Sequence, residues 1–170
     1  MSLTTRLTLL FATGSSVVLL ALGWLIGASI ERHFEEQDRD ALAGKIMLAR
    51  HAIERISTPQ LLAQLPQQLG DAIVGHHDLL IQIASPDKGV LLASPNVVFP
   101  AQWLATASDA PLEPLFKWSH DGRDYRGLAT AIPTGMAGQA PLVVAVAIDI
   151  EHHQMFMTTF MHTLWLFVVG

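Results

Sequence analysis

The sequence predicts an α+β domain, a long N-terminal helix with about five antiparallel strands, placed between two transmembrane helices. Two apolar runs bracket the chain, a helical pattern follows the first, and short apolar strands with turn signals fill the second half. The chain has 170 residues, a net charge of −5 and no cysteine. The mild acidity argues against a nucleic-acid partner, which would favour a basic face. The lack of cysteine removes thiolates from the possible metal ligands.

The first apolar run, residues 9–30, is predicted to cross a membrane. It reads LLFATGSSVVLLALGWLIGASI, and a spanning helix needs roughly 20 apolar residues. A cleaved signal peptide is the competing interpretation, but its apolar region is shorter, about 7–15 residues, and Ala28-Ser29 is a poor cleavage context. Gly23 and Gly27 form a GxxxG pair, which would let a second copy of the helix approach closely.

The second apolar run, residues 155–170, predicts the start of another spanning helix, inside which the sequence ends. We therefore expect the chain to be the N-terminal piece of a longer protein. Residues 1–8 then form a cytoplasmic N-terminus, and residues 31–154 form an external domain. The Lys and Arg count favours the opposite orientation, with only Arg6 before the first run. A domain this long, however, translocates largely regardless of charge.

Helical structure is predicted to continue after the first run. Apolar residues there are spaced 4, 3, 4 and 3 positions apart; they are Leu42, Ile46, Ala49, Ile53 and Ile56. Such a stripe packs either against its own domain or against the same helix of a second copy. A second helix is expected from Pro59, which suits the first helical position, to about Leu69, with Gly70 as terminator.

Strands are predicted in the second half. Residues 79–84 and 90–93 flank a Ser-Pro-Asp-Lys-Gly turn, and residues 115–120 and 123–132 flank Asp121-Gly122, a strong hairpin signal. Residues 141–148 (PLVVAVAI) indicate a buried strand. Asp149 follows and is placed to cap a helix that enters the second run.

Histidines beside the two apolar runs are the main candidate functional residues. The motifs GxxxxGK(S/T), GxSxG, HExxH and CxxC are all missing, so this chain is not expected to be catalytic. His33 follows the first run by one turn, and His153 precedes the second by two residues. Neighbouring helix positions point about 100° apart, so only one of His152 and His153 can face His33. Neutral imidazole suits copper, zinc and nickel, and a two-fold axis would double the donors.

Other potential metal ligands have simpler interpretations. Histidines at expected turns are read as solvated, although hairpins can bring such positions together. Methionine offers a thioether to soft ions, although in an apolar helix it usually fills space. The residues concerned are His76, His77, His120, Met155, Met157 and Met161.

The segment His33-Phe34-Glu35-Glu36-Gln37-Asp38 resembles the start of the periplasmic domain in copper- and silver-responsive sensor histidine kinases of the CopS/CusS type. The opening LTTRLT (3–8) and the close AIDIEHH (147–153) are similar to the same family. The resemblance implies a homodimeric receptor in the bacterial inner membrane, in contact with lipid, with a PAS/PDC-like periplasmic domain. It also implies an ATP-dependent kinase domain beyond Gly170 and a response regulator as partner.

A metal site follows from the same resemblance. The family's His-Phe pair after the first span and His before the second carry over to His33, Phe34 and His153, with His152 as the alternative. The implied ion is Cu(I) or Ag(I), beside the aromatic face of Phe34. Members can carry a long Met- and His-rich loop between two late strands. Here Ser119-His120-Asp121-Gly122 forms a tight turn instead, which weakens the case for an internal second site, for which His77 and His120 are the nearest candidates.

Three alternative functions stay open from the residues alone. The chain could be a PAS-like receptor for a small organic ligand, a pH sensor based on histidine charge, or a membrane-anchored adaptor without ligand. The sequence likewise leaves open which metal is sensed, its stoichiometry and the sign of the kinase response.

Overall fold

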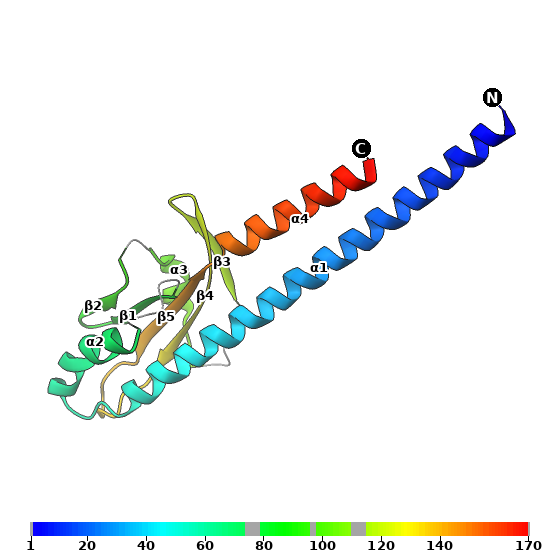
Figure 1. Cartoon of the computed structure of the whole chain (residues 1–170). Coiled ribbons are helices and arrows are strands. Elements are labelled where there is room, and N and C mark those ends of the chain that lie inside the picture. Colours follow the sequence, from blue (N-terminus) through cyan, green and yellow to red (C-terminus); the bar gives the residue numbers. More distant parts are fainter. Residues whose placement is uncertain (1, 74–78, 96–97, 110–114, 170) are drawn as a thin grey trace. The chain divides into compact units, whose positions relative to one another are not determined.

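The computed structural model describes residues 2–73, 79–95, 98–109 and 115–169 (Figure 1). The chain divides into two units, which are Asp38–Glu151 and the pair of segments Met1–Gln37 and His152–Gly170. Helix α1 (Leu3–Glu54) contributes to both units and runs for 52 residues without a break. The prediction that helical structure continues past the first apolar run is therefore confirmed.

The unit Asp38–Glu151 contains a five-stranded antiparallel sheet with the strand order β2-β1-β5-β4-β3. Its strands are β1 (Leu79–Ser85), β2 (Gly89–Ala93), β3 (Phe116–His120), β4 (Arg123–Ile132) and β5 (Leu142–Asp149). Asp121 and Gly122 join β3 to β4 with φ values of 50° and 77°, as a type I′ turn requires. The predicted α+β class is confirmed, with β1 and β5 each ending one residue later than expected.

One face of this sheet packs against α1 and α2 (Pro59–Ile73) to form the main core. The predicted apolar stripe lies in it, with exposures between 0% and 3%, although its last residue, Ile56, follows the end of α1 at Glu54. Val144 and Val146 of β5 face it and are fully buried. The stripe is therefore core of its own domain, and the dimer-seam interpretation is wrong.

Helix α2 begins at Pro59 as predicted but continues past Gly70 to Ile73. Its buried face consists of Leu62, Leu65 and Leu69, which are 1–3% exposed. Burying this stripe outweighs the missing N–H of Pro66 and the low helix propensity of glycine, since packing supplies most helix stability in proteins.

Aromatic rings and the short helix α3 (Ala101–Thr106) lie on the opposite face of the sheet. Trp103 stacks on Phe116 with ring centroids 4.6 Å apart, and Phe99 and Trp118 pack beside them. A Cβ atom at Gly127 would lie 2.7 Å from the carbonyl oxygen of Val146 and 3.0 Å from the Trp118 ring. Glycine is therefore required under this cluster. No sequence pattern indicated α3, because six residues are too few to show a helical apolar period.

In the other unit, helix α4 (Glu151–Val169) packs on α1 at two glycines. A Cβ at Gly23 would lie 2.0 Å from Cδ2 of Leu164, and one at Gly27 would lie 3.1 Å from Cε of Met161. This close approach is what small-xxx-small spacing permits. The GxxxG pair accommodates the chain's own second helix, whereas the sequence suggested a second copy.

Of the described helices, α1 is the one long and apolar enough to cross a membrane by length and composition. Its most apolar 18-residue window has a mean hydropathy of 2.1. The described part of α4 falls short because it opens with the polar residues Glu-His-His-Gln. A second span that starts within α4 stays a prediction.

Candidate metal centre

Phe34 of α1 and His153 of α4 stack face to face in the helix-pair unit. Their ring centroids are 4.2 Å apart and their planes are inclined by 5°. Phe156 meets Phe34 edge-on, with centroids 6.2 Å apart and an interplanar angle of 87°. Aromatic contacts of both kinds hold a ring in one orientation. The structure therefore brings together two of the four predicted site residues.

Asp38, one turn after Phe34, anchors α1 on the domain. Its carboxylate accepts a hydrogen bond from Nη1 of Arg126 in β4, and the two side chains are only 6% and 4% exposed. Residues four apart share a helix face, so Phe34, Asp38 and Leu42 lie along one stripe of α1. The ion pair was not anticipated from the sequence. An acidic residue in register with a buried apolar stripe is the signal that could have revealed it.

Asp149 holds the start of α4. Its Oδ1 accepts a hydrogen bond from the backbone N–H of Glu151 at 2.9 Å, which confirms the predicted cap. Its Oδ2 lies 3.4 Å from Nη1 of Arg123. The N–H of Ile150 donates to the carbonyl of Asp124 at 2.9 Å. Within the unit Asp38–Glu151, the residues that lead into α4 are thus bonded to the β3–β4 hairpin.

Tyr125 is a titratable group of the same region with a perturbed pKa. Burial raises the pKa of its phenol above the ordinary value, and the negative charge of Asp149 adds to the effect. The side chain is 4% exposed, and its ring packs against Trp118 with centroids 5.4 Å apart. The neutral phenol is therefore the form that the fold favours.

The predicted histidines differ in their surroundings. His33 and His152 are exposed, whereas His153 is partly buried and its Nδ1 atom is fully covered. The register that places His153 against Phe34 leaves His152 pointing elsewhere. Within the described part of the chain, no group of three or more His, Asp or Glu side chains is arranged to hold a metal ion.

Candidates for an internal second site are only partly described. His76 and His77 lie outside the described residues. His120 is partly buried beside the hairpin turn, with Nε2 3.6 Å from Oδ2 of Asp121. An internal site that uses His77 and His120 therefore stays a prediction.

The aromatic face of the sheet encloses a cavity of about 10 Å³, lined by rings that include Phe99, Trp103 and Trp118. A buried water molecule needs at least ~10–15 Å³. A cavity of this size offers no support for the alternative of a small organic ligand bound under α3.

Known structures define the class of this fold. The chain resembles the crystal structure of the CusS sensor domain with silver bound, with a TM-score of 0.52 and 17% identity. The match covers 74% of this chain and 97% of that one. The chain therefore shares the α+β fold of that domain.

The family follows from the sequence itself. Residues 1–157 match the model of the CusS sensor domain, so the chain belongs to the CusS sensor domain family. It is 30% identical to the probable sensor protein PcoS of Escherichia coli, over 99% of this chain and 37% of the relative. It is 28% identical to the sensor protein CopS of Pseudomonas syringae pv. tomato, over 96% and 32% respectively. The chain spans about a third of the length of these relatives.

Proposed function

We propose that this chain is the periplasmic sensing region of a two-component sensor histidine kinase, and that it responds to Cu(I) or Ag(I). The Phe34–His153 contact carries this proposal. It joins α1, just after the first apolar run, to α4, just before the second, and it pairs a nitrogen ligand with an aromatic face. The silver bound to the similar CusS sensor domain supports the ion class.

His33, His153 and Phe34 are the proposed metal site, with His152 as the alternative donor. Because Nδ1 of His153 is covered, we expect Nε2 to bind the ion. Stacking on Phe34 fixes the plane of the imidazole, so the direction of its lone pair is set before the ion arrives. A second protomer related by a two-fold axis would double these donors, and the ion would then link the two copies.

The remaining features of the proposal concern the whole protein. Residues 1–8 would lie in the cytoplasm, 9–30 and the segment from 155 would cross the inner membrane, and 31–154 would lie in the periplasm. Ion binding would favour one arrangement of α1 and α4, and only a difference in affinity between the arrangements can drive signalling. Autophosphorylation with ATP and transfer to a response regulator would follow in domains beyond this chain.

An Ag(I) titration of the whole chain in detergent micelles tests the site. We expect the His33→Ala, His153→Ala double variant to lose the interfacial ion and the metal-induced dimer in analytical ultracentrifugation, because a bridging ion stabilises the dimer it binds. His51→Ala is the matched control, since His51 is an exposed histidine of the same helix whose Nδ1 lies 2.8 Å from the carbonyl oxygen of Met47.

Wild-type binding and dimerisation in the double variant would refute this site. A selective loss in His152→Ala with normal binding in His153→Ala would move the donor by one residue. Phe34→Leu separates the aromatic contribution, because it retains an apolar side chain while removing the ring. We expect it to weaken binding less than the double variant does.

A further inference from the structure

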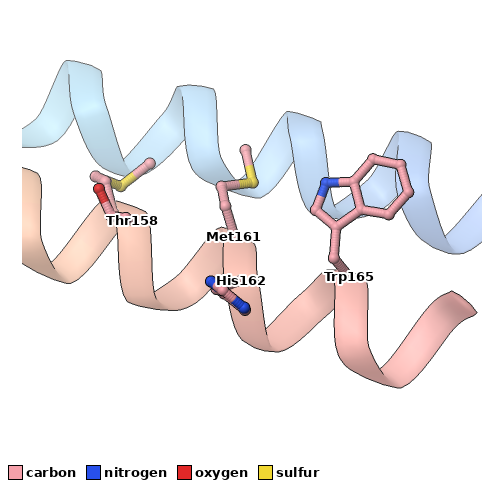
Figure 2. Close-up of a pocket in the computed structure, with 5 residues that line it drawn as sticks. Thr158, Met161, His162 and Trp165 are labelled. Carbon is pink, nitrogen blue, oxygen red and sulfur yellow. The ribbon is translucent and has the colours of Figure 1, made fainter. Parts of the chain in front are cut away.

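A groove runs along α4 beyond the proposed site and is lined by soft donors. It has a volume of about 600 Å³, and the residues that line it are Met157, Thr158, Met161, His162 and Trp165 (Figure 2). Figure 2 shows Met161 and Trp165 directed toward the neighbouring helix, whereas His162 points away from it. The two thioethers and the indole ring are therefore the groups to consider.

Both methionines reach the same point on α1. The Cε atoms of Met161 and Met157 lie 3.1 Å and 3.4 Å from the position that a Cβ of Gly27 would occupy. The missing side chain of Gly27 leaves room for both methyl ends. Each of these methyl groups is bonded to its thioether sulfur, so both sulfur atoms lie one bond away from this point.

Donor chemistry selects the kind of ion. From His152 to Val169, α4 has no Asp, Glu, Lys or Arg, so it offers no hard oxygen anion and no competing cation. Thioether sulfur selects soft ions such as Cu(I), whereas carboxylates suit magnesium and calcium. Two neutral thioethers leave the charge of a monovalent ion in place, and a nearby aromatic face can stabilise that charge.

Trp165 supplies such a face. It lies four residues after Met161, is 55% exposed, and projects from α4 on the same side. An indole ring is the best of the aromatic side chains at attracting a cation. Met157, Met161 and Trp165 thus form a continuous stripe along one face of α4.

We propose that Met157 and Met161 bind one Cu(I) or Ag(I) ion through their thioethers, with the Trp165 ring as a cation–π cap. This second site goes beyond the proposed function, which needs only the donors around His153. Because His153, Met157 and Met161 follow one another at intervals of four residues, the two sites lie along one side of α4.

The test uses the full chain in detergent micelles, with ¹³C-labelled methionine methyl groups and with both His33→Ala and His153→Ala in place. Titration with Ag(I) should shift the ε-methyl signals of Met157 and Met161 together and saturate at one ion per chain. It should also quench the Trp165 fluorescence, which is identified by its loss in Trp165→Phe. The signal of Met155 serves as an internal control, because this exposed residue does not line the groove.

Leucine has a volume similar to that of methionine but carries no sulfur, so leucine variants test the thioethers directly. Met157→Leu or Met161→Leu should remove the saturable ion and the quenching, and Met155→Leu should remove neither. Methyl signals that stay in place, or an ion retained in the Met157→Leu, Met161→Leu double variant, would overturn the proposal. Because His33 and His153 are already replaced, and the ε-methyl signals report Met157 and Met161 directly, the result does not depend on whether the site at His153 exists.

Discussion

Arg126 of β4 donates a hydrogen bond to the carboxylate of Asp38 in α1, and the structure buries both side chains almost completely. This pair joins the helix to the sheet one turn after Phe34. Removing one partner of a buried ion pair leaves a charge without compensation and typically costs about 3–5 kcal/mol. We expect this cost for Arg126→Met, measured by urea unfolding of the whole chain.

The Asp38→Leu, Arg126→Met double variant provides the control for this prediction. Replacing a buried pair by apolar residues of similar size is often neutral or stabilising. We therefore expect the double variant to be more stable than Arg126→Met alone. If the loss of stability in the double variant equals the sum of the losses in Asp38→Leu and Arg126→Met, the two charges do not interact.

The apolar stripe of α1 yields a second prediction. Ile46 is fully buried between α1 and the sheet, and Ile46→Ala should lower the free energy of unfolding by about 2–5 kcal/mol. Met47→Ala is the matched control, because Met47 is 46% exposed on the same turn of the helix. Equal thermal stability of the two variants would contradict the assignment of the stripe to the domain core.

The contact between Gly23 and Leu164 yields a third prediction. A methyl group at position 23 overlaps the end of the Leu164 side chain, and such overpacking typically costs about 1–3 kcal/mol. Spin labels at the exposed positions Leu25 and Thr163, in a chain without native cysteine, should report a changed distance in Gly23→Ala.

Two further variants separate this clash from a general effect of alanine. Leu164→Ala should restore the spin-label distance in the Gly23→Ala background, because it removes the overlapping atoms. Gly14→Ala should leave the distance unchanged, since no atom lies within 4 Å of a Cβ there. A Gly23→Ala chain with the wild-type distance would mean that α1 and α4 do not pack through this glycine.

Tyr125 yields a prediction about alkaline pH. Its folded-state pKa lies above the ordinary value of 10.0, so the folded chain holds its phenolic proton more tightly than the unfolded chain. The stabilisation is complete below about pH 10 and is lost as the pH rises through the folded-state pKa. Tyr125→Phe should show a flatter fall in unfolding free energy over this alkaline range.

Tyr125 is also the single tyrosine of the chain, so ultraviolet absorbance of phenolate reports it alone. We expect the absorbance midpoint of the folded protein above pH 10, and that of the urea-unfolded chain near the ordinary value. A folded midpoint at or below the ordinary value would contradict the role of burial.

Local patterns made much of the domain predictable. The Asp121-Gly122 signal located the β3–β4 hairpin, because both residues adopt the positive φ that such a turn needs. The spacing of the apolar residues of α1 identified one side of the core. The Asp38–Arg126 pair, by contrast, joins residues 88 positions apart, and no local pattern encodes it.

Sequence patterns alone identified fewer residues of the candidate site than of the domain core. Spacing placed histidines near both apolar runs but left His152 and His153 equivalent. Phe34 was identified through family resemblance, since an aromatic residue on an amphipathic helix has no distinctive pattern. The stacking of Phe34 on His153 depends on the helix register, which only the structure provides.

The β3–β4 hairpin turn, whose flanking residues bond to Asp149 and Ile150, has a consequence for how this fold can vary among sequences. Arg123 and Asp124 bond to Asp149 and Ile150, whereas Asp121 and Gly122 between the strands are exposed. A recognition loop inserted at this tip would preserve the strand pairing and leave the core intact. Its movements would nevertheless reach Asp149, which bonds to Arg123 and caps α4. Changes in length and sequence can thus be accommodated at one surface turn, without redesign of the sheet and helices beneath it.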